Sequence, residues 1–226
     1  MKTTIKLFAL CMTCLFFTHT NAQTYVGLNL GLRGSSVSAI TDEVNAEFLV
    51  PIVSFTVGAK LEHHLSRRFI VQTGIDLSAR GFGIEIMENE AEYFYEERFG
   101  YVDVPLALKF HAGSDKFGLN LMAGTTLGFA LGGQSNSYVA LSTEEDKVRE
   151  EVSESIDFAA SEYSKFNAAI LLGTGLYAKI GNARIFMDVA MEGGLTPLVA
   201  GQGDSHFVGT SFNTGVVFAL GGKGEK

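Results

Sequence analysis

Hydrophobic and polar residues alternate with a period of two through residues 100–131, on both sides of a short polar turn at 112–116. Val104 lies on the apolar face of the first half, whereas Asp103 and Lys109 lie on the opposite face. The second half also has one apolar face and one face of small and polar residues. Because successive side chains of a β-strand point to opposite faces, this pattern predicts two antiparallel strands joined by a hairpin turn.

The same alternation recurs along the chain and predicts eight strands. They are expected at residues 25–32, 53–63 and 69–81, in both halves of 100–131, at 166–180 and 183–195, and in the segment that ends at 220. Long connections alternate strictly with short ones: 33–51, 82–99, 132–164 and 196–206 are long, and 64–68, 112–116 and 181–182 are short. An even number of antiparallel strands with all long connections at one end is typical of outer-membrane barrels. We therefore expect an all-β fold, an eight-stranded antiparallel up-and-down transmembrane β-barrel with long extracellular loops and short periplasmic turns.

Two of the long connections have patterns of their own. The aromatic and acidic alternation in 82–99 suggests that this hairpin extends beyond any membrane. In 132–164, residues 142–145 fit a helix capping box. Apolar residues then recur at four-residue spacing, which predicts a short amphipathic helix. These residues are Val148, Val152 and Ile156.

Pro105 falls in the middle of a predicted strand. Proline has no N–H to donate to the ladder, so it occurs in sheets at edges and bulges. We expect a bulge or a local bend in the wall at this position, which is an architectural feature and not a catalytic one.

The N-terminus has the pattern of a secretory signal peptide. Lys2 and Lys6 precede an apolar stretch at 7–17, and small residues before Gln23 fit a cleavage site. The apolar stretch is too short to span a bilayer, and both cysteines of the chain lie inside it. We therefore expect the barrel to form without disulfides. The expected division of the chain is a cleaved signal peptide at 1–22, an outer-membrane β-barrel at 23–220 and a polar C-terminal tail at 221–226.

The net charge of the chain bears on which class of partner it can bind. The 226 residues include 17 Lys and Arg against 25 Asp and Glu, a net charge of −8, which argues against nucleic-acid binding. A soluble eight-stranded barrel of the lipocalin type would show the same alternation. The small and polar inner face, the mid-strand charges and the segregated long loops favour the membrane alternative. We expect a monomer surrounded by outer-membrane lipid.

Residues 101–110, YVDVPLALKF, resemble a strand of the PorT-like outer-membrane β-barrel family of Bacteroidota. The segments at 27–34, 124–128 and 194–196 are also similar to that family. The resemblance covers nearly the whole predicted barrel and implies an outer-membrane location. Some members are implicated in type IX secretion, and most have no known activity. One departure is that a polar tail follows Phe218, where outer-membrane barrels often end on an aromatic residue.

Charged residues on the inward face are the candidate site, with five of each sign. They are Lys60, Glu62, Asp76, Arg80, Asp103, Lys109, Lys179, Arg184, Asp188 and Glu192. Buried charges need partners, and an eight-stranded barrel is narrow enough for side chains to fill. We expect a structural salt-bridge network in the lumen, the alternative being a selectivity or proton-relay site. Asp76 and Asp103 should repel one another unless Arg80 reaches them.

We expect no catalytic residues, no cofactor and no metal site. Some eight-stranded outer-membrane proteins are lipid-modifying enzymes with a rim His and Ser, and only Asp204-Ser205-His206 offers such residues here. Adjacent residues rarely point together, and no nucleophile elbow or oxyanion motif accompanies them. The acidic runs at 85–97 and 144–157 fit no EF-hand loop and are expected to be solvated. The function predicted from the sequence is a non-enzymatic structural or interaction role, with secretion as one option and a partner bound through the acidic loops or the periplasmic turns. A lipid-modifying enzyme and a small pore are the alternatives.

Overall fold

The computed structural model describes residues 23–38, 48–88, 91–114, 116–142, 147–158, 161–200 and 205–220. The predicted signal peptide and C-terminal tail lie outside the described residues. Nine strands are formed: β1 (Thr24–Val37), β2 (Leu49–His64), β3 (Phe69–Glu88), β4 (Ala91–Gly113), β5 (Phe117–Ser142), β6 (Lys147–Ile156), β7 (Phe166–Ile180), β8 (Ala183–Gly194) and β9 (Phe207–Leu220). Each pairing between neighbouring strands is antiparallel.

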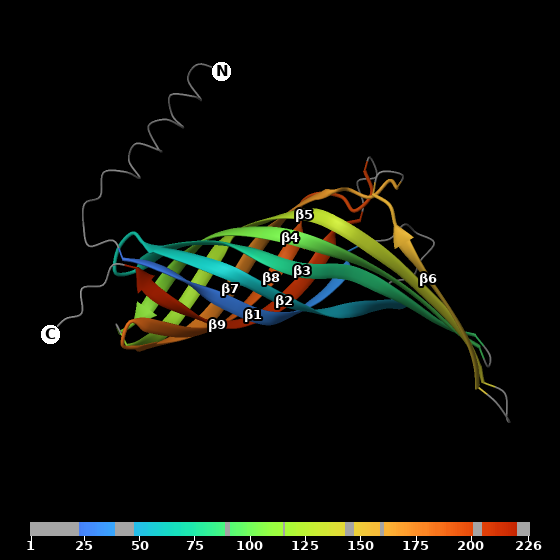
Figure 1. The fold of residues 1–226 in the computed structure, drawn as a ribbon, viewed down its shortest axis with the longest axis horizontal. Helices are drawn as coiled ribbons and strands as arrows, with labels where there is room; N and C mark the ends of the chain where they lie inside the picture. The colour runs from blue at the N-terminus through green and yellow to red at the C-terminus, as the bar shows by residue number, and fades with distance from the viewer. Residues whose placement is uncertain are drawn as a thin grey trace, which may run out of the picture.

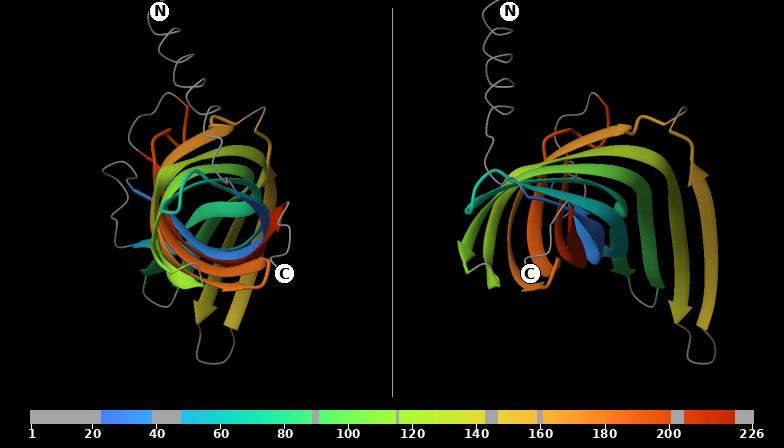
Figure 2. Two further views of the ribbon diagram at one scale, coloured as in Figure 1. Left: turned by 90° about the vertical axis from the view of Figure 1, so that its left-hand side faces the viewer. Right: turned by 60° about the vertical axis from the view of Figure 1, so that its left-hand side comes forward.

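The sheet closes on itself into a barrel-like ring. Strands pair in the order β4-β3-β2-β1-β9-β8-β7-β5-β6, and a further pairing between β4 and β5 completes the ring. Thr24 at the start of β1 faces Leu220 at the end of β9, so the first and last strands begin and end at the same end of the barrel. Figure 2 (left) looks along this ring.

The expected count of eight strands is wrong by one. Eight strands form the ring, and β6 pairs with β5 alongside it. The segment that the sequence predicts as an amphipathic helix is therefore a strand. The physical reason is that a spacing of four residues fits two geometries, since positions 148, 152 and 156 share a face in a helix and also in a strand. Residues 143–145 of the expected capping box lie outside the described residues.

Short turns agree with the sequence prediction better than long connections do. Residues 65–68 join β2 to β3, and Gly181 and Asn182 join β7 to β8, with Gly181 at φ 60 in the left-handed region that glycine tolerates. β1 and β3 continue past their expected ends, to Val37 and Glu88. The extended hairpin predicted in 82–99 is confirmed, because β3 and β4 stay paired up to Glu88 and Ala91.

Three strands of the ring, β3, β4 and β5, continue beyond it and form a projecting sheet together with β6 (Figures 1 and 2). It consists of residues 85–88 of β3, 91–98 of β4, 132–142 of β5 and the whole of β6. We call this end of the barrel the tip end, and the end with the three short turns the turn end.

Pro105 does not sit at a bulge. The paired positions of β3 and β4 skip Val104 and Pro105, and the register is the same on both sides of this gap. Pro105 still faces Thr126 in the β4–β5 ladder. The ladder shifts register between Gly100 and Tyr101 instead, so the missing N–H of proline interrupts one ladder without changing which residues face each other.

The ring has an apolar outside and a polar inside. Leu28, Leu30 and Phe55 point outward and are 68%, 62% and 83% exposed. Inward positions on the same strands are buried, as at Asn29 and Thr56. This distribution is the reverse of a soluble protein and suits a wall surrounded by hydrocarbon.

In the part of the chain that the structure describes, no helix has the length and apolar character needed to cross a membrane.

Candidate functional site

The lumen contains two clusters of buried ion pairs, one above the other. The turn-side cluster consists of Lys60, Glu62, Lys109, Arg184 and Asp188. The tip-side cluster consists of Arg33, Arg80, Asp103 and Glu192. All nine side chains are at most 9% exposed. Such burial is tolerable only because each charge has an opposite charge and hydrogen bonds.

Asp188 and Glu62 organise the turn-side cluster. Asp188 Oδ2 accepts hydrogen bonds from Lys60 Nζ at 2.9 Å and from Lys109 Nζ at 3.0 Å. Lys109 Nζ also donates to Glu62 Oε1 at 3.0 Å, and Arg184 lies 3.5 Å from the other oxygen of Glu62. Strands β2, β4 and β8 are thereby tied together across the lumen.

A bidentate pair dominates the tip-side cluster. The two terminal nitrogens of Arg33 donate to the two carboxylate oxygens of Glu192 at 2.8 and 3.0 Å. Arg80 donates to Asp103 Oδ1 at 2.5 Å and also to the side chain of Asn167. Charge-assisted bidentate bonds of this kind are strong and geometrically specific.

Asp76 and Asp103 do face each other in the β3–β4 ladder, as their strand positions suggest. Arg80 binds Asp103, and Ser78 Oγ donates to the second oxygen of Asp103 at 2.6 Å. Asp76 instead accepts a hydrogen bond from Asn29 Nδ2 at 3.0 Å. The two carboxylates therefore have separate hydrogen-bond partners.

Glycines make room for the inward carboxylates. Gly58 faces Asp76, and Gly175 faces Asp188, across neighbouring strands. A Cβ at either glycine would overlap the carboxylate oxygen of its partner. Gly128 and Asp103 form a third such pair, with 2.6 Å between a built Cβ and Asp103 Oδ1. The small residues of the polar face therefore serve to accommodate charged neighbours.

Aromatic rings cover both clusters. At the turn end Tyr25, Tyr177 and Phe186 are buried together. Lys60 Nζ lies 3.7 Å from the centre of the Phe186 ring, and the Arg184 guanidinium lies 4.5 Å from that of Tyr25, both cation–π distances. At the tip end Phe99 and Tyr101 pack with further apolar residues over the tip-side cluster. That group also contains Val37, Phe82, Leu198 and Phe207.

A small polar cavity of about 40 Å³ separates the two clusters. Its lining includes five side-chain oxygens that are buried and accept no hydrogen bond from the described residues. They belong to Asn29, Thr56, Gln72, Asp188 and Asn213. A cavity of this size has room for a small number of water molecules, each of which could donate to these oxygens.

Eight of the ten residues predicted from the sequence form ion pairs in these clusters. Asp76 and Lys179 make no ion pair with the residues that the structure describes, and Lys179 is half-buried at the turn end. Arg33 also belongs to the tip-side cluster, and the sequence prediction misses it because the predicted connection 33–51 includes this residue. Continued alternation after Leu32 was the signal that could have found it, since position 33 has the same parity as the inward residues of β1.

The structure describes two of the three rim residues, Ser205 and His206, and both accept backbone hydrogen bonds. Asp204 lies outside the described residues. Ser205 accepts a hydrogen bond from Leu198 N at 2.7 Å through its backbone oxygen, and His206 accepts one from Ser38 N at 2.8 Å in the same way. Among the described side chains, no group of three or more His, Cys, Asp or Glu is placed to hold a metal ion.

An apolar outer wall, a charged and tightly paired lumen and a ring of antiparallel strands together define a membrane β-barrel-like protein. Residues 21–200 match the family described as "Outer membrane protein beta-barrel domain". The chain therefore belongs to this family, and its place is the outer membrane. No curated protein is similar enough in sequence to count as a relative.

Solved structures of outer-membrane proteins are also similar to this chain. Ail, the attachment invasion locus protein of Yersinia pestis, has 13% identity and a TM-score of 0.35, over 88% of this chain and 99% of that one. CarO of Acinetobacter baumannii has 13% identity and a TM-score of 0.42, over 84% and 97%. The outer membrane protease OmpT of Escherichia coli has 8% identity and a TM-score of 0.36, over 90% and 99%. Likeness at this level carries no information about activity.

Proposed function

We propose that this protein is a closed, non-enzymatic outer-membrane barrel that binds a cationic partner through its projecting sheet, outside the cell. The observation that carries the proposal is the distribution of charge. Segments 82–99 and 132–158, which contain the projecting strands, hold 13 of the 25 acidic residues and three of the 17 basic ones. Outside these segments and the predicted signal peptide, twelve acidic and twelve basic residues balance. These two segments of the sequence therefore carry the net negative charge of the chain.

The projecting sheet also exposes apolar and aromatic side chains. Met87 is 72% exposed, Tyr93 44% and Val152 54%. Phe94 and Tyr138 share the face of Met87, opposite to that of Tyr93 and Val152, and their rings stack at 4.9 Å, which gives this face a rigid aromatic surface. Exposed apolar residues among acidic ones suit a polypeptide partner that is basic and partly apolar. A secretion component is the partner class that the resemblance to the PorT-like family suggests.

Site-specific crosslinking in cells tests this proposal. A photoreactive residue at Tyr93 should capture a basic polypeptide, and the adduct should weaken with added salt. The combined variant Glu85→Gln, Glu92→Gln, Glu154→Gln should reduce the adduct. The same photoreactive residue at Phe55, on the outer wall of the ring, is the matched control and should capture none. No adduct at Tyr93, or an adduct that neither salt nor the glutamine variant weakens, would contradict the proposal.

The closed lumen argues against a pore. Nine buried charges bridge the interior in two layers, and aromatic residues cover both. Purified protein in a planar bilayer should therefore give no stable conductance steps. Regular steps that disappear with a lumen substitution would support the pore instead.

A rim enzyme is the second alternative, and lipid profiling tests it directly. We expect the outer-membrane lipids of cells with Ser205→Ala and His206→Ala to match those of the wild type. A lipid species that is lost in both variants would favour the enzyme.

A further inference from the structure

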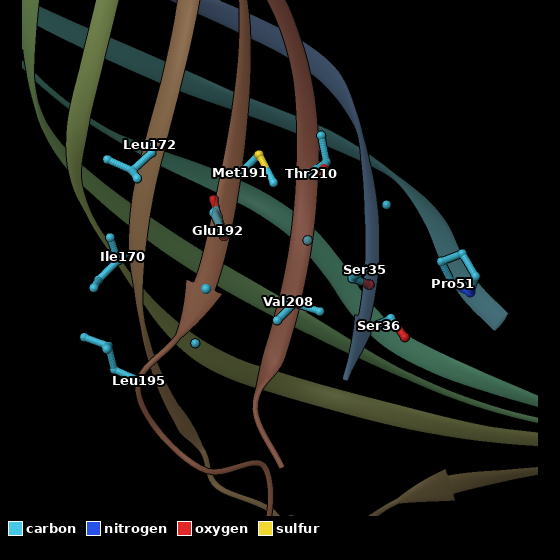
Figure 3. A pocket seen from close by; sticks show the side chains of 14 residues that line it. Ser35, Ser36, Pro51, Ile170, Leu172, Met191, Glu192, Leu195, Val208 and Thr210 are labelled. Carbon is cyan, nitrogen blue, oxygen red and sulfur yellow. The ribbon is translucent and has the colours of Figure 1, made fainter. Parts of the chain in front are cut away.

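The outer wall of the barrel has a mostly apolar groove, whose lining includes one member of the lumen network, Glu192 (Figure 3). Its volume is about 790 Å³, and it runs from β7 across β8, β9 and β1 to β2. Pockets that bind small molecules commonly measure about 300–1,000 Å³ and are mostly apolar. The groove is therefore large enough to hold a ligand.

Strand register explains why the wall is hollow here. Two neighbouring rows of outward residues run around the barrel through successive register partners. The first row is Leu172, Met191, Thr210, Gly34 and Val53, and the second is Ile170, Gly193, Val208 and Ser36. Large side chains stand at the β7 end of each row, and the residues over β9 and β1 are smaller. In Figure 3 Ile170, Leu172 and Leu195 lie on one side of the groove and Pro51 on the other.

The groove is continuous with the apolar surface that faces lipid. Ile170 and Leu172 form its wall and are 48% and 58% exposed on the outside of the ring. On β1 the exposed Leu32 is followed at the next outward positions by Gly34 and Ser36, which line the groove. The groove therefore lies toward the tip end of the apolar wall and opens sideways to the membrane. A molecule within the membrane can enter it without crossing water.

We propose that this groove binds one acyl chain of a membrane phospholipid. Hydrocarbon matches the Ile, Leu, Met, Val and Pro lining, and the chain would fill the depression over Gly34 and Gly193. Thr210 and Ser36 place two hydroxyl-bearing side chains in the same groove, where the ester region of a lipid could accept hydrogen bonds. The lipid would be held at one place on the wall, unlike the exchanging lipids around the rest of the barrel.

Filling the groove tests the proposal. A Cβ at Gly193 meets no atom within 4 Å, so Gly193→Leu adds a side chain to the groove without a clash in the ladder. Gly132 is equally open and does not line the groove, which makes Gly132→Leu the matched control. Both variants should keep the heat-modifiable gel migration of a folded barrel. If Gly193→Leu does not fold, Gly34→Val fills the same groove from β1.

The measurement is native mass spectrometry of the detergent-solubilised full chain, titrated with dimyristoyl phosphatidylglycerol or, separately, with myristate. The wild type and Gly132→Leu should retain one phospholipid, and the groove variant should lose it. Equal retention in all three proteins would show ordinary surrounding lipid and overturn the proposal. Retention of myristate without phospholipid would also overturn it, because the ligand would then be a free fatty acid.

Discussion

Gly175 faces Asp188 across the β7–β8 ladder, and the space that a Gly175 side chain would need is occupied by Asp188 Oδ1. The other oxygen of Asp188 binds Lys60 and Lys109. A glycine on the wall therefore determines whether the ion pairs of the turn-side cluster can form. Gly58 and Gly128 leave space in the same way for the carboxylates of Asp76 and Asp103.

Gly175→Ala should destabilise the barrel by displacing Asp188. We expect the free energy of unfolding to fall by about 1–3 kcal/mol, the usual cost of overpacking an interior site. Urea titration of the detergent-solubilised protein measures it. Gly132→Ala is the control, because its Cβ would meet no atom within 4 Å, and it should change stability by about 0.5 kcal/mol or less. Equal effects of the two changes would mean that Asp188 can move without loss.

Asp103→Leu should lower the heat resistance of the folded barrel. The change leaves the guanidinium of Arg80 buried without its main partner. The nearest remaining carboxylate in the tip-side cluster is that of Glu192, at 3.9 Å. Removing one partner of a buried pair typically costs about 3–5 kcal/mol. The temperature at which the folded band disappears in a heat-modifiability gel should drop. A change in membrane permeability with an unchanged melting temperature would refute the structural role of the network.

Two arginines provide a matched comparison between buried and exposed ion pairs. Arg33→Ala removes the bidentate partner of a buried Glu192 and should cost about 3–5 kcal/mol. Arg98 pairs with Glu96 at 2.8 Å, but its side chain is 42% exposed, so Arg98→Ala should cost about 1 kcal/mol or less. Chemical denaturation of the two variants under one condition checks the difference. Comparable losses would show that the lumen pairs add little stability.

The projecting sheet should lose stability at high pH. Burial and the hydrogen bond to Glu97 raise the pKa of Tyr95 from 10.0 to about 12. The pKa of Tyr163 is raised by burial and by the same carboxylate, to which its hydroxyl donates at 2.7 and 2.5 Å. An unfolded chain would release these protons near pH 10, whereas the folded sheet retains them. The stabilisation from Tyr95 is therefore complete below pH 10 and is lost as the pH rises through about 12, and that from Tyr163 persists to higher pH.

Absorbance of ionised tyrosine checks this prediction. In a pH titration, the wild type should show a late-ionising fraction that is smaller in Tyr95→Phe. Glu97→Gln should shift the ionisation toward pH 10, since the anion that opposes phenolate formation is gone. Tyrosine ionisation that is unaffected by Glu97→Gln would rule out this cause.

Much of the ring could be predicted because the alternation is long and regular. The bounds of β7 match the predicted strand, and the turn at Gly181 and Asn182 is where the sequence places it. The failures lie where the pattern permits two interpretations. Spacing by four residues fits a strand as well as a helix in β6, and residues 33–37 look like a linker because they are rich in Gly and Ser.

The sequence predicts which residues belong to the candidate site, but it does not predict which of them form ion pairs with each other. Strand parity alone indicates that Lys60, Asp103 and Asp188 point inward. Which carboxylate meets which amine depends on strand register and on the positions of glycines such as Gly175, and neither follows from the parity of one strand. Arg33 falls outside the prediction for a separate reason, since β1 continues five residues beyond the predicted end at Leu32.

The length of β5 keeps the acidic residues of the projecting sheet away from the buried ion pairs of the lumen. Its projecting part, 132–142, extends about 35 Å at the rise of a β-strand. Charges in water are screened over about 8 Å at physiological ionic strength, so the field of the acidic tip fades before it reaches the lipid surface. The lumen pairs are shielded from solvent ions and keep their strength. Added salt should therefore weaken partner binding to the projecting sheet and leave the stability of the barrel unchanged.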